Sequence, residues 1–244
     1  MRSTAIVLLG IAWGIPPGLT AQAQLEFAPY VGSYRPTSII GIGDGSFPNP
    51  NTPPQGVRDT VRQLNSAARG IRVTKWGPGR LGFEATVGYA PSSLWSSLAY
   101  TARVYDAHVL TMSLKALQRV TPPQARAALY VGGGVVLVDH GGEAWNSDAS
   151  YHGPKMFVGG IANAGAAVKP VGWLRVRFDA EDFVYFAHLG PCTRSGPGSG
   201  GVCDVFGEWA ARTTGARLQN ELVLSVGLAL VLHVAERHGS ESHQ

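Results

Sequence analysis

Residues 172–182 read GWLRVRFDAED, and the interpretation of the whole chain turns on this stretch. A β-strand points successive side chains to opposite faces, so a strand here has one apolar face and one fully charged face. The apolar face carries Leu174, Val176, Phe178 and Ala180, and the other carries Arg175, Arg177, Asp179 and Glu181. An exposed hairpin on a soluble sandwich could show this pattern, because its charged face would meet water. The choice depends on whether the pattern recurs and on how its repeats are connected.

The alternation recurs along the chain. It is clearest in RLGFEATVGYAP (80–91), RAALYVGGGVVL (126–137) and ELVLSVGLALVL (221–232). The eight candidate strands are 25–36, 67–76, 80–91, 108–118, 126–137, 155–168, 173–185 and 221–232. Most have about ten residues or more, whereas the usual strand has about five or six. A tilted strand that crosses a bilayer needs about nine to eleven residues.

The connections between these segments alternate between short and long. GPG at 77–79, VTPPQA at 120–125 and KPVG at 169–172 are short, while the links at 37–66, 92–107, 138–154 and 186–219 are long. Both termini then lie at the short-turn side. Outer-membrane barrels have this asymmetry, with short periplasmic turns and long extracellular loops. The sequence therefore predicts an all-β fold: an eight-stranded antiparallel up-and-down transmembrane β-barrel.

In such a barrel the apolar face of 173–183 meets lipid and the charged face points into the lumen. A sheet in lipid has to close on itself, because lipid offers no hydrogen bonds to an open edge. By strand parity the predicted lumen charge network comprises Arg72, Glu84, Lys115, Arg126, Arg175, Arg177, Asp179 and Glu181, with Glu26 and Glu221 as further candidates. Buried charges have to be paired, and both signs are present, so we expect a plugged lumen and not an open channel.

Small and aromatic residues complete this picture. Inward glycines and alanines are expected to make room for the long Arg and Glu side chains; they are Gly82, Gly88, Ala128, Gly132 and Gly134. Aromatic residues at or just beyond strand ends are expected at the membrane interfaces. These residues are Trp76, Tyr89, Trp95, Tyr100, Trp145 and Tyr151.

The N-terminus has the pattern of an export signal. Arg2 precedes an apolar run, Pro16 and Pro17 break it, and Ala21-Gln22-Ala23 provides a small-x-small cleavage site. The alternative is a buried N-terminal helix, which the two prolines disfavour. We therefore expect a signal peptide at 1–23, a barrel at 24–234 and a polar tail at 235–244.

Composition narrows the function classes further. Cys192 and Cys203 flank a polar loop and would form a disulfide in an oxidising compartment. A metal site would need more soft ligands nearby, so neither metal nor cofactor is predicted. The net charge is +4 and the basic residues are scattered, which gives no nucleic-acid footprint. The longest apolar stretch, 222–232, is far shorter than the roughly 20 residues of a membrane helix.

The chain resembles bacterial outer-membrane β-barrel domains of the small OmpA/OmpX-like kind in its exported N-terminus and in three segments. These segments are GRLGFEATVGYAPSS (79–93), RVRFDAEDF (175–183) and NELVLSVGLALVL (220–232). The resemblance covers 25–234. It implies a Gram-negative outer membrane, contact with its lipid and lipopolysaccharide, and assembly by the barrel-assembly machinery. Such barrels usually end in an aromatic residue, whereas here the last strand runs into His233 and a polar tail.

Three functions remain open at this point. The first is a structural or interaction scaffold with a plugged lumen and long loops that an extracellular partner could contact. The second is a small pore or a conduit for hydrophobic molecules, and the third is a lipid hydrolase. A hydrolase needs a nucleophile beside a His and a carboxylate. The candidates are Asp139, His140, Glu143, Ser150 and His152, which in a Gly-rich loop are typical of solvated residues, so no catalytic residue is assigned and a non-enzyme is expected. A soluble lipocalin-type barrel would instead have an apolar interior.

Overall fold

The computed structural model describes residues 24–38, 41–44, 58–98, 101–122, 125–142, 156–187 and 217–233. The strands are β1 (Gln24–Pro36), β2 (Gly41–Asp44), β3 (Arg58–Gln63), β4 (Ser66–Trp76), β5 (Leu81–Leu98), β6 (Thr101–Arg119), β7 (Ala127–Gly141), β8 (Met156–Val171), β9 (Leu174–Ala187) and β10 (Arg217–His233). Within these ranges, no helix is long and apolar enough to cross a membrane.

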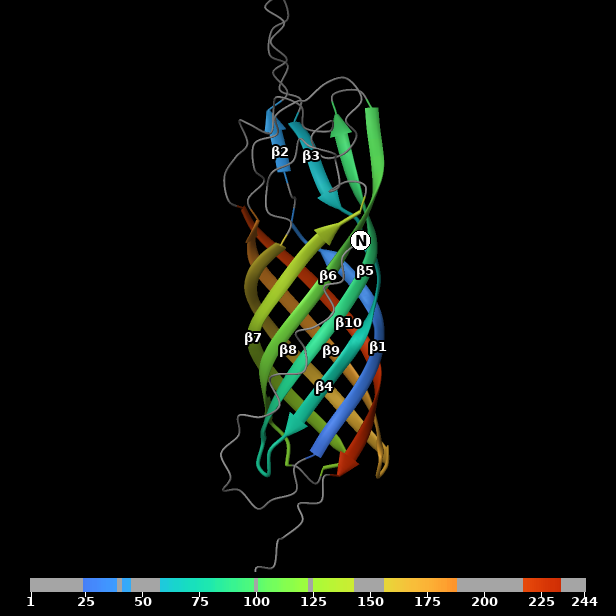
Figure 1. The fold of residues 1–244 in the computed structure, drawn as a ribbon, viewed down its shortest axis with the longest axis vertical. Coiled ribbons are helices and arrows are strands. Elements are labelled where there is room, and N and C mark those ends of the chain that lie inside the picture. Colours follow the sequence, from blue (N-terminus) through green and yellow to red (C-terminus); the bar gives the residue numbers. More distant parts are fainter. Residues whose placement is uncertain are drawn as a thin grey trace, which may run out of the picture.

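Eight of the strands form a closed antiparallel barrel (Figure 1). Around the ring the order is β1-β4-β5-β6-β7-β8-β9-β10, and β1 pairs with β10 to close it, with Gln24 opposite His233 and Tyr30 opposite Gly227. Closure gives each strand two hydrogen-bonded neighbours, which is what a lipid environment requires. The predicted eight-stranded up-and-down barrel is confirmed, and each of the eight predicted segments coincides with one of its strands.

The short connections lie together at one end of the barrel (Figure 1), which we call the turn end. They are residues 77–80, 120–126 and 172–173. The first is closed by a hydrogen bond from Gly77 N to Leu81 O at 2.9 Å. β1 begins and β10 ends at the same end, as the alternation of short and long links predicts. The opposite end is called the loop end.

The loop end contains strands that the sequence interpretation assigned to loops. β5 and β6 remain paired up to Leu98 and Thr101, and β3 pairs with the upper part of β5, with Thr60 opposite Ser97. β2 pairs with β3. These four segments rise above the barrel (Figure 1) and are called the loop-end sheet. The long links predicted at 37–66 and 92–107 therefore contain strand segments that were not predicted, because a hairpin already in register can carry polar residues along its ladder.

The two faces of the barrel have opposite chemistry. Large apolar side chains cover the outside, with Val158 74% and Phe83 66% exposed, while Arg72 is completely buried. Along β9 the buried positions are every second residue from Arg175 to Ala187. A soluble protein would reverse this arrangement. Residues 172–182 therefore lie as predicted, with their apolar face outward and their charged face inward.

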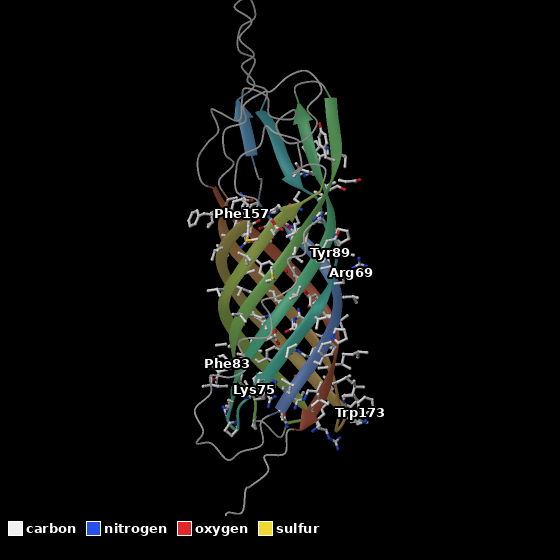
Figure 2. All side chains as sticks on the ribbon, viewed as in Figure 1. Arg69, Lys75, Phe83, Tyr89, Phe157 and Trp173 are labelled. Atoms are coloured by element: carbon white, nitrogen blue, oxygen red, sulfur yellow. The ribbon has the colours of Figure 1, made fainter. Side chains whose placement is uncertain are left out.

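Two expectations about neutral residues were wrong. Trp76 was assigned to the membrane interface but faces the lumen, where only 2% of it is exposed. Gly82 and Gly88 make room for aromatic residues and not for charged side chains, and Gly132 lies against Leu117. A Cβ on Gly82 would lie 2.6 Å from the Trp76 ring, and one on Gly88 would lie 2.5 Å from the Tyr30 hydroxyl. By contrast, Tyr89 faces outward near the loop end (Figure 2).

Several predicted features lie outside the described residues. They are the signal peptide at 1–23, the tail at 235–244, Cys192 and Cys203, the loop candidates Glu143, Ser150 and His152, and the aromatic residues Tyr100, Trp145 and Tyr151. The disulfide and the export signal therefore stay predictions.

Candidate functional site

The barrel interior is crossed at mid-height by a cluster of six charged side chains, which we call the central cluster. Its members are Arg72 on β4, Glu84 on β5, Lys115 on β6, and Arg177, Asp179 and Glu181 on β9, all of them buried. Each belongs to the predicted lumen network. Strand parity brings them together, because these positions share the inward face of their strands.

Arg72 contacts all three carboxylates of the cluster. Its Nη2 atom donates to Glu181 Oε2 at 2.9 Å, and its Nη1 lies 3.4 Å from Asp179 Oδ2. Its Nε lies 3.8 Å from Glu84 Oε1. The two longer contacts are ion pairs without hydrogen-bond geometry. The face of the guanidinium lies 3.8 Å from the Tyr30 ring centroid, a cation–π contact.

Arg177 and Lys115 complete the charge pairing. Arg177 Nη1 lies 2.8 Å from Glu84 Oε2, and its Nη2 lies 3.1 Å from Asp179 Oδ1. Lys115 Nζ lies 2.8 Å from Glu84 Oε1 and also pairs with Glu181. Every charge in the central cluster therefore has at least two opposite partners, which a buried ion needs to offset its desolvation.

Neutral side chains add further hydrogen bonds to the central cluster. Thr74 donates to Glu84 at 2.5 Å and accepts from Arg177 at 2.9 Å. The Tyr130 hydroxyl donates to Asp179 at 2.7 Å and accepts from Arg177 Nε at 3.0 Å. Sequence reasoning did not assign these residues to the network, although parity places both of them on the inward face.

A second cluster lies toward the turn end. Glu26 pairs with Arg175 and lies 3.5 Å from Arg119 Nη2, and Arg175 Nη2 donates to Gln24 at 3.0 Å. The Arg119 guanidinium stacks 3.8 Å from the Trp76 ring centroid. Arg175 and Glu26 were expected in the lumen, whereas Arg119 was missed because the predicted strand ended one residue before it.

Arg126 is the member of the predicted network that the structure places elsewhere. It is exposed and lies in the turn before β7, where its carbonyl accepts from Lys169 N at 2.9 Å. Its parity matches that of the inward Tyr130, but the strand begins one residue later than predicted. Its side chain therefore lies beyond the rim, and it takes no part in either cluster.

Toward the loop end the lumen becomes apolar around one buried carboxylate. Glu221 Oε1 accepts from the Tyr34 hydroxyl at 2.5 Å and from the Tyr185 hydroxyl at 2.7 Å. Tyr185 is also hydrogen-bonded to His140 Nε2 at 2.8 Å. Buried apolar side chains surround this series of hydrogen bonds; they include Val136, Val138, Phe157, Phe183 and Val223. Among the side chains that the structure describes, which do not include those of Arg58, Arg103 and Arg217, no cation lies within 4 Å of Glu221.

The adjacent residues Asp139 and His140 do not form a catalytic pair. His140 is buried and faces the lumen, whereas Asp139 is half-buried on the opposite face of β7. Successive residues of a strand diverge in this way. The described ranges hold no group of three His, Cys, Asp or Glu side chains that could bind a metal ion.

The lumen contains a small cavity. A cavity above the central cluster is lined by Tyr30, Tyr34, Gly88, Thr111 and Val223, among others, and has room for about one water molecule.

No protein-family model and no curated protein matches the sequence. Solved structures do match the fold. The outer membrane protein OprG from Pseudomonas aeruginosa is 13% identical, with a TM-score of 0.57 over 89% of this chain and 99% of that one. The outer membrane protein AlkL, solved in lipid bilayers, is also 13% identical, with a TM-score of 0.52 over 98% of this chain and 100% of that one. The chain has the fold of these outer-membrane β-barrels, a closed ring of eight strands, and its apolar exterior suits a lipid bilayer.

Proposed function

We propose that this barrel is a non-conducting scaffold whose lumen is plugged by the central cluster. The observation that carries the proposal is the contact between Arg177 and Glu84, which joins opposite walls of the barrel at 2.8 Å with both side chains buried. An eight-stranded barrel has an interior just wide enough for side chains. A charge pair across that width leaves no room for a hydrated ion.

The energetics favour a plug that stays closed. Separating a buried ion pair costs about 3–5 kcal/mol, because each charge loses its partner without gaining water. In the central cluster the charges share partners, so Arg177 cannot leave Glu84 without also disturbing Asp179. The apolar layer around Glu221 adds a second barrier toward the loop end.

The role as a scaffold is supported by what the barrel carries. The loop-end sheet continues β5 and β6 beyond the barrel rim and adds β2 and β3 (Figure 1). A rigid closed barrel can hold such an extension at a fixed place on the cell surface, where long loops commonly make functional contacts. This favours contact with an extracellular partner over transport through the lumen.

Conductance across a planar bilayer tests the proposal. The refolded mature chain, from Gln24 on, should give no steady current steps. A charge-neutral variant that removes the plug (Arg72→Ser, Arg177→Ser, Glu84→Ser and Asp179→Ser) should conduct, which shows that the assay detects an open barrel. If that variant fails to fold, the smaller pair Lys115→Ser and Glu181→Ser serves the same purpose. Steady conductance of the unmodified chain would overturn the proposal in favour of a pore.

A further inference from the structure

Three arginines lie on the outer surface near the loop end, on two paired strands, β1 and β4, and on β3, which pairs with β5 as β4 does. They are Arg35 on β1, Arg62 on β3 and Arg69 on β4, and all three are exposed. Figure 2 shows Arg69 beside Tyr89 on the outside of the barrel. We call these three residues the loop-end arginines. They face the membrane and its surface, on the opposite side of the barrel wall from the lumen network.

Two of the loop-end arginines rest on aromatic rings. The Arg62 guanidinium lies 4.8 Å from the Trp95 ring centroid, and that of Arg69 lies 5.6 Å from the Tyr89 centroid. His108 lies on the other side of Tyr89, with their ring centroids 5.5 Å apart. Stacking uses the flat face of a guanidinium and leaves its N–H edge free to donate. Rings of this kind mark the interface between membrane and water.

Among the side chains that the structure describes, which do not include those of Asp44 and Asp59, no carboxylate lies within 4 Å of these arginines. The Nε atom of Arg35 donates to Ser33 Oγ at 3.3 Å. Asp106 on β6 faces outward opposite Ser93 but makes no ion pair with the loop-end arginines. A basic surface at a membrane interface attracts anionic lipid headgroups.

The length of the surface that carries the loop-end arginines indicates which kind of anionic lipid fits it. Arg69 pairs in register with Tyr89, and Arg62 pairs with Trp95 six positions further along β5. That separation corresponds to about 20 Å along a strand. A glycerophospholipid has one phosphate at a single depth. Lipopolysaccharide carries phosphates on its lipid A and on its inner core, so its negative charge extends outward from the bilayer surface.

We propose that the loop-end arginines form a lipopolysaccharide-binding strip, in which the guanidinium edges bind lipid A and core phosphates while the aromatic rings pack against the acyl and sugar parts. Guanidinium groups bind phosphate through paired hydrogen bonds, which makes arginine better suited than lysine. The proposal rests on the outer surface of the barrel and is independent of whether the lumen conducts.

Native mass spectrometry of the folded full chain in detergent tests the proposal, with purified lipopolysaccharide as the probe. The variant Arg35→Gln/Arg62→Gln/Arg69→Gln should bind it at least about tenfold more weakly than the unmodified chain. A matched control removes three exposed cations at the turn end (Lys75→Gln, Arg80→Gln and Arg126→Gln) and should bind as the unmodified chain does. Replacing the same three loop-end arginines by Lys should give intermediate binding.

Two further probes identify the source of the phosphate. Dephosphorylated lipopolysaccharide should bind more weakly than the intact lipid, and phosphatidylglycerol should not compete with it. Equal binding by the loop-end variant and the unmodified chain would overturn the proposal. So would an equal loss of binding in the turn-end control, because the effect would then follow net charge alone.

Discussion

Arg177 of β9 and Glu84 of β5 meet across the lumen, with Nη1 and Oε2 2.8 Å apart, although their strands stand on opposite sides of the eight-stranded ring. The contact is possible because the barrel is narrow and both residues occupy the inward face of their strands. It makes the stability of the barrel and the proposed closure of its lumen depend on the same atoms.

Removing Glu84 should therefore be costly. In Glu84→Ala, Arg72, Lys115 and Arg177 would each lose one carboxylate while remaining buried. The free energy of unfolding should fall by about 3–5 kcal/mol, measured by urea titration in lipid vesicles. Arg126→Ala removes an exposed charge and should change it by less than about 0.5 kcal/mol. Similar losses in the two variants would show that the central cluster contributes nothing specific.

Glu221 should stabilise the loop end as a hydrogen-bond acceptor. Glu221→Ala leaves the hydroxyls of Tyr34 and Tyr185 in an apolar layer without that acceptor, at about 1–3 kcal/mol for each hydroxyl. Glu221→Gln keeps an amide oxygen at the same place and should retain most of the stability. If thermal unfolding shows equal losses in both variants, the negative charge of Glu221 matters more than its acceptor geometry.

Gly165 should tolerate no side chain, because a Cβ there would lie 2.3 Å from the Tyr130 ring. Gly165→Ala would displace the hydroxyl that contacts Asp179 and Arg177, and should destabilise the barrel by about 1–3 kcal/mol. Gly160→Ala is the matched control, since a Cβ at that position meets nothing within 4 Å. For Gly160→Ala the free energy of unfolding should rise slightly or stay the same. Equal stabilities of the two variants would show that Tyr130 is not packed against Gly165.

The outer surface should show a dependence on depth. Phe178 is 52% exposed beside the central cluster, so Phe178→Arg places a charge deep in the lipid and should cost about 2–4 kcal/mol. Trp173 is exposed at the turn end (Figure 2), where the same substitution should cost about 0–1 kcal/mol. Unfolding in vesicles measures both. Equal costs would mean that these two positions are not at different depths of a bilayer.

The barrel itself could be predicted from the sequence because a two-residue period with opposite chemistry on each face is a strong signal. The same parity located Arg72, Glu84 and the charged residues of β9. It also identified Glu26 and Glu221 as candidates, and both are buried. Parity cannot give the exact end of a strand. An error of one residue at a strand end left Arg119 out of the predicted lumen charge network and placed Arg126 in it.

Other features depend on neighbours that are distant in the sequence. In the sequence, Trp76 has the position of an interface aromatic residue at a strand end. In the structure its ring stacks against Arg119 of β6. The loop-end sheet contains Ser-rich and Pro-containing stretches, and β3 is a strand through its pairing with β2 and β5. The chain of contacts from Tyr34 through Glu221 and Tyr185 to His140 joins four strands and has no local signature.

The most direct test of a plugged lumen is the access of water to its centre. Ser225 is buried on β10, where its hydroxyl accepts from Arg72 Nη2 at 2.8 Å. In a chain with Cys192 and Cys203 replaced by Ser, Ser225→Cys should resist a small charged thiol reagent applied to folded barrels in vesicles and react after unfolding. Thr37→Cys, exposed at the loop end, should react at once. Equally rapid labelling of Cys at position 225 in the folded barrel would show a water path through the lumen and contradict the proposed plug.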